Sequence, residues 1–125
     1  MLKDNERLDL LIKEDLKIIQ NDDVFSFSTD ALLLGDFTEI RKKDKIIDIC
    51  SGNGVIPLLL SHKGSQTIEG IEIQQQLVDM AKRSFKYNQL DDRLLMHQMD
   101  VKKVYHHFKP SQYTVVTCNL SLIHI

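Results

Sequence analysis

A β-branched run that ends in a small-residue turn and leads into a helix constrains this chain more than any other feature. The run covers residues 45–50, the turn covers residues 51–54, and apolar residues then recur at helical spacing over residues 55–62. Pro57 fits such a helix, because amides in the first helical turn have no partner within the helix. A strand, a glycine turn and a helix in this order predict the first unit of a parallel α/β sheet.

The alternation of strand and helix continues along the chain. The predicted strands are residues 45–50, 67–73, 93–99 and 113–118. The predicted helices are residues 28–40, 55–62, 74–87 and 102–108. We expect the first helix to bury a wide face, Gly64 to end the second helix and Asn88 to end the third in a left-handed conformation. The fold class is therefore α/β, a doubly wound sheet of about four parallel strands with flanking helices.

The composition suits one folded domain. Hydrophobic residues make up 42% of the 125 residues and charged residues 27%. Residues 1–27 are expected to be a lead-in segment that contains a brief strand at 25–27. The net charge of −2 does not point to a polyanion partner. The two cysteines lack Cys-x-x-Cys spacing and no apolar run could span a membrane, so we expect a cytoplasmic protein with reduced thiols.

Residues 48–54 are suited to hold a ligand at the edge of the sheet, because ligands of open α/β sheets bind beyond the carboxyl ends of the strands. Gly52 and Gly54 can adopt backbone angles that other residues resist, and the following helix offers free amides. Glu72 ends the next strand and can accept hydrogen bonds from both hydroxyls of a ribose. Asp100 ends the third strand and can accept a hydrogen bond from the amino group of an adenine ring. The pattern predicts a nucleotide-like cofactor.

The loop does not fit the common phosphate-binding patterns. No Gly-Lys-Ser/Thr follows it, and Gly-x-Gly-x-x-Gly is not completed because Pro57 stands at the last position. A cofactor without a pyrophosphate therefore suits the loop better than NAD. The alternative interpretation is a tight turn between strand and helix, with Glu72 as a solvated acid.

The histidines and cysteines do not predict a metal site. Adjacent His106 and His107 point apart on a helix, and no carboxylate or thiol stands at a recognisable ligand spacing. Cys50 has no evident histidine partner, which favours a packed thiol over a nucleophile.

Four segments of the chain resemble the bacterial methyltransferases that modify N6 of an anticodon-loop adenine in valine tRNA. The segments are residues 25–34, 48–56, 71–73 and 99–101. The first is the most telling, because the glycine loop alone occurs throughout methyltransferases. The resemblance spans residues 16–119. It implies a Rossmann-like methyltransferase domain at residues 28–119 that binds S-adenosyl-L-methionine, acts on valine tRNA and, when complete, is a monomer without metal.

The resemblance also implies the site residues. Residues before the first strand help to cover the methionine part of the cofactor, which brings in Phe27 and Asp30. The implied cofactor-binding residues are Phe27, Asp30, Asp48, Cys50, Gly52, Asn53, Gly54, Glu72, Ile73, Asp100 and Val101. Asn119 is the implied catalytic residue, whose side chain and following carbonyl accept the hydrogens of the target amine.

The chain departs from the family after Asn119. The family motif is Asn-Pro-Pro-Tyr, whose aromatic ring stacks on an extruded base, whereas Leu120, Ser121 and Leu122 follow here. We therefore expect this chain to be an inactive, truncated form. Residues 120–125 match what a transposon end used in sequencing-library preparation encodes in one frame, so we expect a foreign or frameshifted tail.

Two other functions remain open from the sequence. A different Asn-Pro-Pro-Tyr methyltransferase, acting on a release-factor glutamine or on guanine N2 of ribosomal RNA, would share the cofactor half. A non-catalytic binding module or fragment would keep the cofactor site alone.

Overall fold

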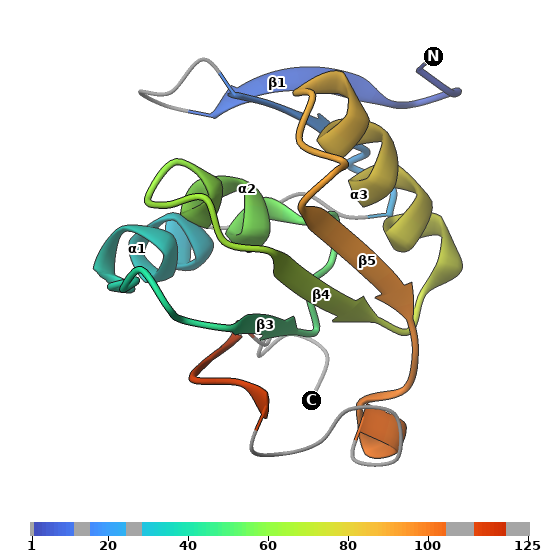
Figure 1. The fold of residues 1–125 in the computed structure, drawn as a ribbon. Helices are drawn as coiled ribbons and strands as arrows, with labels where there is room; N and C mark the ends of the chain where they lie inside the picture. The colour runs from blue at the N-terminus through green and yellow to red at the C-terminus, as the bar shows by residue number, and fades with distance from the viewer. Residues whose placement is uncertain (1, 12–15, 25–28, 105–111, 120–125) are drawn as a thin grey trace.

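The computed structural model describes residues 2–11, 16–24, 29–104 and 112–119, and its main element is a parallel sheet (Figure 1). The sheet strands are β3 (Ile46–Ile49), β4 (Ile68–Glu72), β5 (Leu94–Gln98) and β6 (Val115–Cys118). They lie in the order β5-β4-β3-β6, and each neighbouring pair is parallel. The predicted α/β fold with four parallel strands and flanking helices is confirmed.

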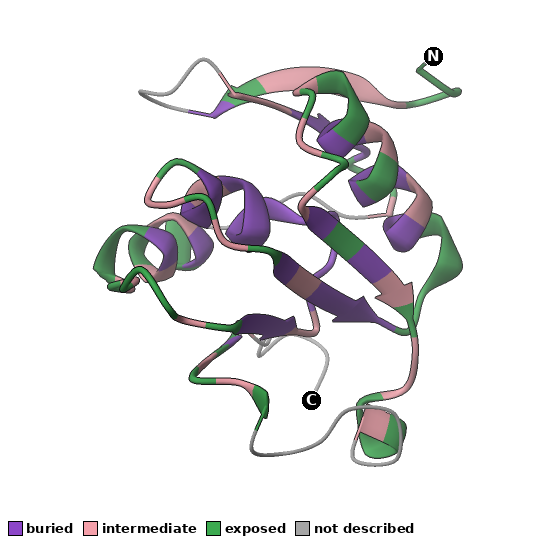
Figure 2. Ribbon diagram, in the orientation of Figure 1, coloured by how far each residue is buried: buried purple, intermediate pink, exposed green. Residues whose placement is uncertain are grey.

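The face of the sheet that packs on the helices follows from the two-residue period of the strands. Ile46 pairs in register with Ile68 and Val115, and Ile68 pairs with Leu94. These four side chains belong to the core or pack against it. Figure 2 shows the buried residues concentrated where the strands meet the helices.

The helices on the sheet are α1 (Thr29–Phe37), α2 (Val55–Ser61) and α3 (Gln75–Tyr87). The helix α2 is almost entirely apolar and buries six of its seven residues, as expected for a helix at the centre of a small core. It ends at Ser61, before the predicted stop at Gly64.

The helix α3 is amphipathic, and its buried stripe includes Leu77, Ala81 and Phe85 as predicted. The predicted left-handed stop at Asn88 is wrong, because Asn88 has φ −89° and the left-handed residue is Gln89 with φ 59°. Asn88 instead uses its side chain, which donates to the carbonyl oxygens of Lys17 and Ser84 and accepts from the amide of Lys17.

An antiparallel hairpin occupies the expected lead-in segment, which was not predicted to form paired strands there. Its strands are β1 (Arg7–Leu11) and β2 (Leu16–Gln20). Leu11, Ile18 and Ile19 are at most 1% exposed, so the hairpin contributes to the core. It packs on α3 (Figure 1).

The helix α1 differs from the prediction in burial and length. It buries only Ala31 and Gly35, and it ends at Phe37 rather than at residue 40. Leu33 is 62% exposed and Phe37 is 85% exposed. The expected wide buried face is wrong, because α1 packs on the short helix α2 and little of its surface finds a neighbour among the described residues.

The chain after β5 forms a short 3-10 helix, η1 (Val101–Lys103), rather than the start of an α-helix at Lys102. The brief strand expected at residues 25–27 and the helix expected beyond residue 104 fall largely outside the described residues. No helix in the described part of the chain has the length and apolarity to cross a membrane.

Candidate cofactor site

The loop between β3 and α2 has an unusual backbone. Cys50, Gly52 and Gly54 adopt left-handed conformations with φ of 56°, 59° and 86°. The amide of Gly54 donates to the carbonyl of Ser51 over 3.0 Å, which closes the turn. Gly54 precedes the first residue of α2. The predicted need for glycine at positions 52 and 54 agrees with these angles.

Close packing also requires glycine at Gly54. A Cβ atom there would lie 2.8 Å from the ring of Phe85 and 3.0 Å from Cβ of Ala81. Both neighbours belong to α3, so this glycine lets the loop approach the helix that follows β4. The loop and α3 are therefore fixed against each other.

Glu72 holds the loop from the end of β4. Its Oε1 accepts a hydrogen bond from the amide of Gly52 over 2.9 Å, and its Oε2 accepts one from the amide of Gln74 over 3.0 Å. Glu72 is 7% exposed. A carboxylate has about four acceptor positions, so these two bonds leave acceptor capacity for a pair of ligand hydroxyls.

Asp48 lies beneath the loop and ties it to β6. Its Oδ2 accepts from the hydroxyl of Ser51 and its Oδ1 accepts from the hydroxyl of Thr117, both over 2.6 Å. Burial raises the pKa of Asp48 to about 6. The hydrogen bonds from the two hydroxyls lower this pKa, and the nearby charge of Glu72 raises it slightly, but burial has the largest effect. Asp48 thus supports the site from below and does not line the pocket.

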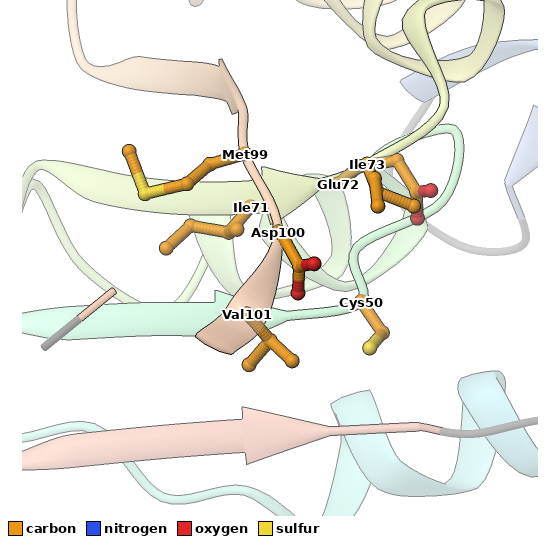
Figure 3. A pocket seen from close by; sticks show the side chains of 7 residues that line it. All are labelled: Cys50, Ile71, Glu72, Ile73, Met99, Asp100 and Val101. Carbon is orange, nitrogen blue, oxygen red and sulfur yellow. The ribbon is translucent and has the colours of Figure 1, made fainter. Parts of the chain in front are cut away.

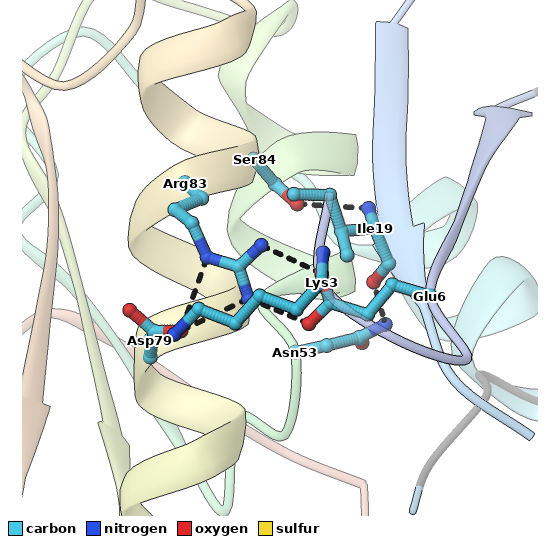
Figure 4. A network of polar contacts seen from close by, with 7 residues as sticks. All are labelled: Lys3, Glu6, Ile19, Asn53, Asp79, Arg83 and Ser84. Carbon is cyan, nitrogen blue, oxygen red and sulfur yellow. Dashed lines mark hydrogen bonds and ion pairs between the residues drawn. The ribbon is translucent and has the colours of Figure 1, made fainter. Parts of the chain in front are cut away.

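Asn53 anchors the loop to the hairpin (Figure 4). Its Nδ2 donates to the carbonyl of Ile19 over 3.0 Å, and the amide of Ile19 donates to the hydroxyl of Ser84 over 2.9 Å. Asn53 is fully buried, and its Oδ1 has no hydrogen-bond partner among the residues that the structure describes. The loop and α3 are therefore both hydrogen-bonded to the hairpin at the backbone of Ile19.

Five of the predicted cofactor residues line one pocket at the carboxyl ends of β3, β4 and β5 (Figure 3). The lining residues are Cys50, Ile71, Glu72, Ile73, Met99, Asp100 and Val101. The pocket has apolar walls and two carboxylates, and no lysine or arginine is found among the described residues that line it. This chemistry suits a ligand with hydroxyl and amino groups and a neutral or positive charge, and it does not suit a polyphosphate.

Asp100 has a structural role as well. Its Oδ1 accepts from the amide of Lys102 over 3.0 Å, so the carboxylate caps η1. Met99 beside it donates its amide to the carbonyl of Glu72, which holds the two strand ends together at 3.0 Å. The two acids are thus brought to the same edge of the sheet.

Two further predicted residues, Asn119 and Asp30, are described by the structure and do not line this pocket. Asn119 directly follows β6, so it stands at the same sheet edge as the loop. Asp30 is exposed in the first turn of α1 and does not line the pocket. Phe27 lies outside the described residues.

Sequence reasoning missed Ser51 and Thr117, which bind Asp48, and Ile71 and Met99, which line the pocket. Ile71 and Met99 directly precede the two predicted acids, so their position at the strand ends was a usable signal. No spacing rule connects Thr117 to Asp48, because 69 residues separate them.

The fold and the strand-edge pocket define a class. Residues 46–125 match the family model described as Methyltransferase domain, and the chain belongs to this family.

Among curated proteins the chain is similar to tRNA1(Val) (adenine(37)-N6)-methyltransferases. The Vibrio campbellii protein is 30% identical over 94 residues, which cover 74% of this chain and 38% of the relative. The Aliivibrio fischeri protein is 30% identical over 97 residues with the same coverage. The resemblance found in the sequence is confirmed, and the chain spans about two fifths of the length of these relatives.

Solved structures agree on the fold. An RNA methyltransferase from Salinibacter ruber, in complex with S-adenosyl-L-homocysteine, superposes with a TM-score of 0.62 and 24% identity. The match covers 78% of this chain and 61% of that protein.

Proposed function

We propose that this chain is the cofactor-binding part of an S-adenosyl-L-methionine-dependent methyltransferase whose target is N6 of adenine 37 in valine tRNA. The observation that supports this cofactor is the pocket of Glu72 and Asp100 beside the left-handed loop, whose described lining residues include no lysine or arginine. The target is taken from the printed names of the relatives. A tRNA substrate implies a cytoplasmic enzyme, which we propose acts as a monomer.

Each pocket residue is assigned to a different part of the cofactor. Glu72 would accept hydrogen bonds from the ribose hydroxyls. Asp100 would accept a hydrogen bond from the amino group of adenine, whose ring would lie between the apolar side chains of Ile73 and Val101. The main chain of the loop, with Gly52 and Gly54, would approach the methionine part. When bound, this cofactor supplies an electrophilic methyl group on a sulfonium. A pocket lined by two carboxylates favours such a cation.

Asn119 is the residue of this chain that we assign to the target base. An exocyclic adenine amine is a weak nucleophile, because its lone pair is delocalised into the ring. The amide oxygen of Asn119 would accept a hydrogen bond from this amine and orient it, which lowers the barrier to methyl transfer by positioning. The residues that follow in the family motif differ here, so we propose that this chain binds the cofactor without turning over.

Calorimetric titration of the 125-residue chain tests the cofactor assignment. We expect S-adenosyl-L-homocysteine and S-adenosyl-L-methionine to bind, and NAD and ATP to give no heat, because the described pocket residues offer their phosphates two carboxylates and no lysine or arginine. Binding of NAD with no binding of S-adenosyl-L-homocysteine would contradict the proposal.

The target is tested with the corresponding full-length protein that carries the complete motif. Labelled methyl transfer should produce N6-methyladenosine in valine tRNA and leave release factor and ribosomal RNA unlabelled. Label on a release-factor glutamine or on a ribosomal guanine would assign the enzyme to one of those substrates instead.

A further inference from the structure

The two cysteines of the chain meet beside the cofactor pocket. Cys118 is the last residue of β6 and the register partner of Ile49, the residue before Cys50. Figure 3 shows the side chain of Cys50 at the edge of the pocket. Burial raises the pKa of Cys50 to about 11, and the adjacent Cys118 thiol adds to this shift. The thiols are therefore immediate neighbours.

This arrangement meets the geometric requirement for a disulfide. Cys50 lies one residue beyond the register partner of Cys118. With neighbouring strands about 4.8 Å apart and a rise of about 3.3 Å per residue, the two Cα atoms are roughly 6 Å apart. Disulfides join residues whose Cα atoms are about 4.4–6.8 Å apart. Cys118 is exposed and Cys50 is half-buried, so a small reagent can reach the pair.

We propose that Cys50 and Cys118 form an oxidisable dithiol, which a low-molecular-weight disulfide converts into an internal disulfide that weakens cofactor binding. The chemical step depends only on the two thiols. Its effect on the cofactor rests on the function proposed above.

The reaction is a pair of thiol–disulfide exchanges. The thiolate of Cys118 attacks one sulfur of oxidised glutathione, forms a mixed disulfide and expels one glutathione thiolate, which takes up the proton that Cys118 released. The thiolate of Cys50 then attacks Sγ of Cys118 and expels the second glutathione, which takes up the proton from Cys50. Two cysteine thiols are oxidised, and one molecule of oxidised glutathione is reduced to two thiols. Because the thiolate is the nucleophile and the pKa of both thiols is raised, the reaction should accelerate with rising pH.

The disulfide would act on the pocket through Cys50. Cys50 lines the pocket, and its left-handed backbone belongs to the loop that Glu72 holds at Gly52. Cys118 lies outside the pocket lining and belongs to the strand before Asn119. A bond between them fixes the Cys50 side chain against β6 and constrains the loop that receives the ligand.

The test compares the reduced and oxidised 125-residue chain. The chain is incubated at pH 8.5 with excess oxidised glutathione or with dithiothreitol, and its free thiols, its intact mass and its affinity for S-adenosyl-L-homocysteine are measured. We expect oxidation to remove both free thiols and two hydrogen atoms, to leave no glutathione attached and to weaken binding roughly tenfold. Dithiothreitol should restore the original affinity.

Cys118→Ser is the matched control. In dithiothreitol it should bind S-adenosyl-L-homocysteine as the parent chain does, and with oxidised glutathione it should form no internal disulfide. An internal disulfide in the parent chain with unchanged affinity for S-adenosyl-L-homocysteine would overturn the proposed effect of the disulfide on cofactor binding. Retained glutathione or cross-linked dimers in place of an internal disulfide would overturn the dithiol itself. A reduced chain that binds no ligand would overturn the proposed function, and with it the effect of the disulfide on cofactor binding. Disulfide formation itself is measured independently of binding, from the intact mass.

Discussion

The carboxylate of Glu72 joins the cofactor loop to the end of β4, because its Oε1 accepts the amide of Gly52 at 2.9 Å while its Oε2 accepts the amide of Gln74 at 3.0 Å. The same side chain lines the pocket. One residue therefore shapes the loop and faces the ligand, and its loss should affect both.

Glu72→Ala should lower stability and cofactor affinity together. The substitution leaves the amides of Gly52 and Gln74 without their acceptor, which costs roughly 1–3 kcal/mol of unfolding free energy. It also removes the proposed acceptor of the ribose hydroxyls. Urea denaturation and calorimetry with S-adenosyl-L-homocysteine measure the two effects. Glu69→Ala is the control, since Glu69 lies on the same strand, accepts a hydrogen bond from Tyr113 and does not line the pocket. An equal loss of affinity in both variants would argue against the assigned role of Glu72.

Asp48→Asn should stabilise the chain at neutral pH. In the folded chain the pKa of Asp48 is about 6, against an ordinary value of 3.8, so the folded state binds the proton more tightly than the unfolded state. The resulting stability is complete below pH 3.8 and is lost as the pH rises through 6, a difference of about 3 kcal/mol. Asparagine avoids this cost, and it can still accept from one of the two hydroxyls and donate to the other.

The measurement is urea denaturation of Asp48→Asn and the parent chain from pH 4 to pH 8. The unfolding free energy of the variant should increase relative to that of the parent as the pH rises, and the variant should be about 1–3 kcal/mol more stable at pH 7. Asp48→Ala is the control, because it removes the charge and also leaves Ser51 and Thr117 without their shared acceptor. A pH-independent difference between Asp48→Asn and the parent would show that Asp48 does not titrate in this range.

Arg83→Lys should loosen the hairpin. The Nη1 and Nη2 atoms of Arg83 donate to the two carboxylate oxygens of Glu6 at 2.7 and 2.6 Å, and the Glu6 side chain is only 2% exposed (Figure 4). Lysine cannot reproduce this two-pronged contact. We expect Arg83→Lys to lower the unfolding free energy by about 1–3 kcal/mol. Hydrogen exchange in β1 should rise as well.

The effect of Arg83→Lys should depend on pH. Arg83 lowers the pKa of Glu6 below its usual 4.5, so this contribution is present above pH 4.5 and is lost as the pH falls through the lower, folded-state pKa. The gap between variant and parent should therefore narrow in acid. Lys82→Ala, an exposed neighbour on the same helix, should change stability by at most about 0.5 kcal/mol. A comparable loss in both variants would mean that the loss in Arg83→Lys does not come from the contact with Glu6.

Local features of the site were predictable from the sequence, whereas its long-range supports were not. The glycine positions at 52 and 54 follow from a strand, a tight turn and a helix that are adjacent in sequence. Glu72 follows from its position at the end of the next strand. By contrast, Asn53 reaches Ile19 across 34 residues, and Arg83 reaches Glu6 across 77. Such pairings depend on tertiary packing, which local sequence patterns do not reveal.

Burial was harder to predict than element type for the same reason. The apolar residues of α1 correctly indicated a helix, but its exposed Leu33 and Phe37 could not be foreseen, because burial depends on which elements lie opposite. The hairpin shows the converse case. Its strands carry weak alternation, and they are buried because α3 presents a stripe to them.

Gly54→Ala should destabilise the chain through two separable effects. Alanine is strained at φ 86°, and its Cβ would lie 2.8 Å from the ring of Phe85. We expect a combined loss of roughly 2–4 kcal/mol. Replacing Phe85 by leucine in the same chain should recover only the steric part, since the backbone angle is unchanged. A double-mutant cycle in urea measures this part as a coupling energy of about 1–2 kcal/mol between the two sites.

Gly64→Ala is the control, because its new Cβ would meet the flexible end of Gln66 and its φ is not positive. Strict additivity of the Gly54 and Phe85 substitutions would mean that the loop moves away from α3 at little cost, and the loss in Gly54→Ala would then be due to the backbone angle.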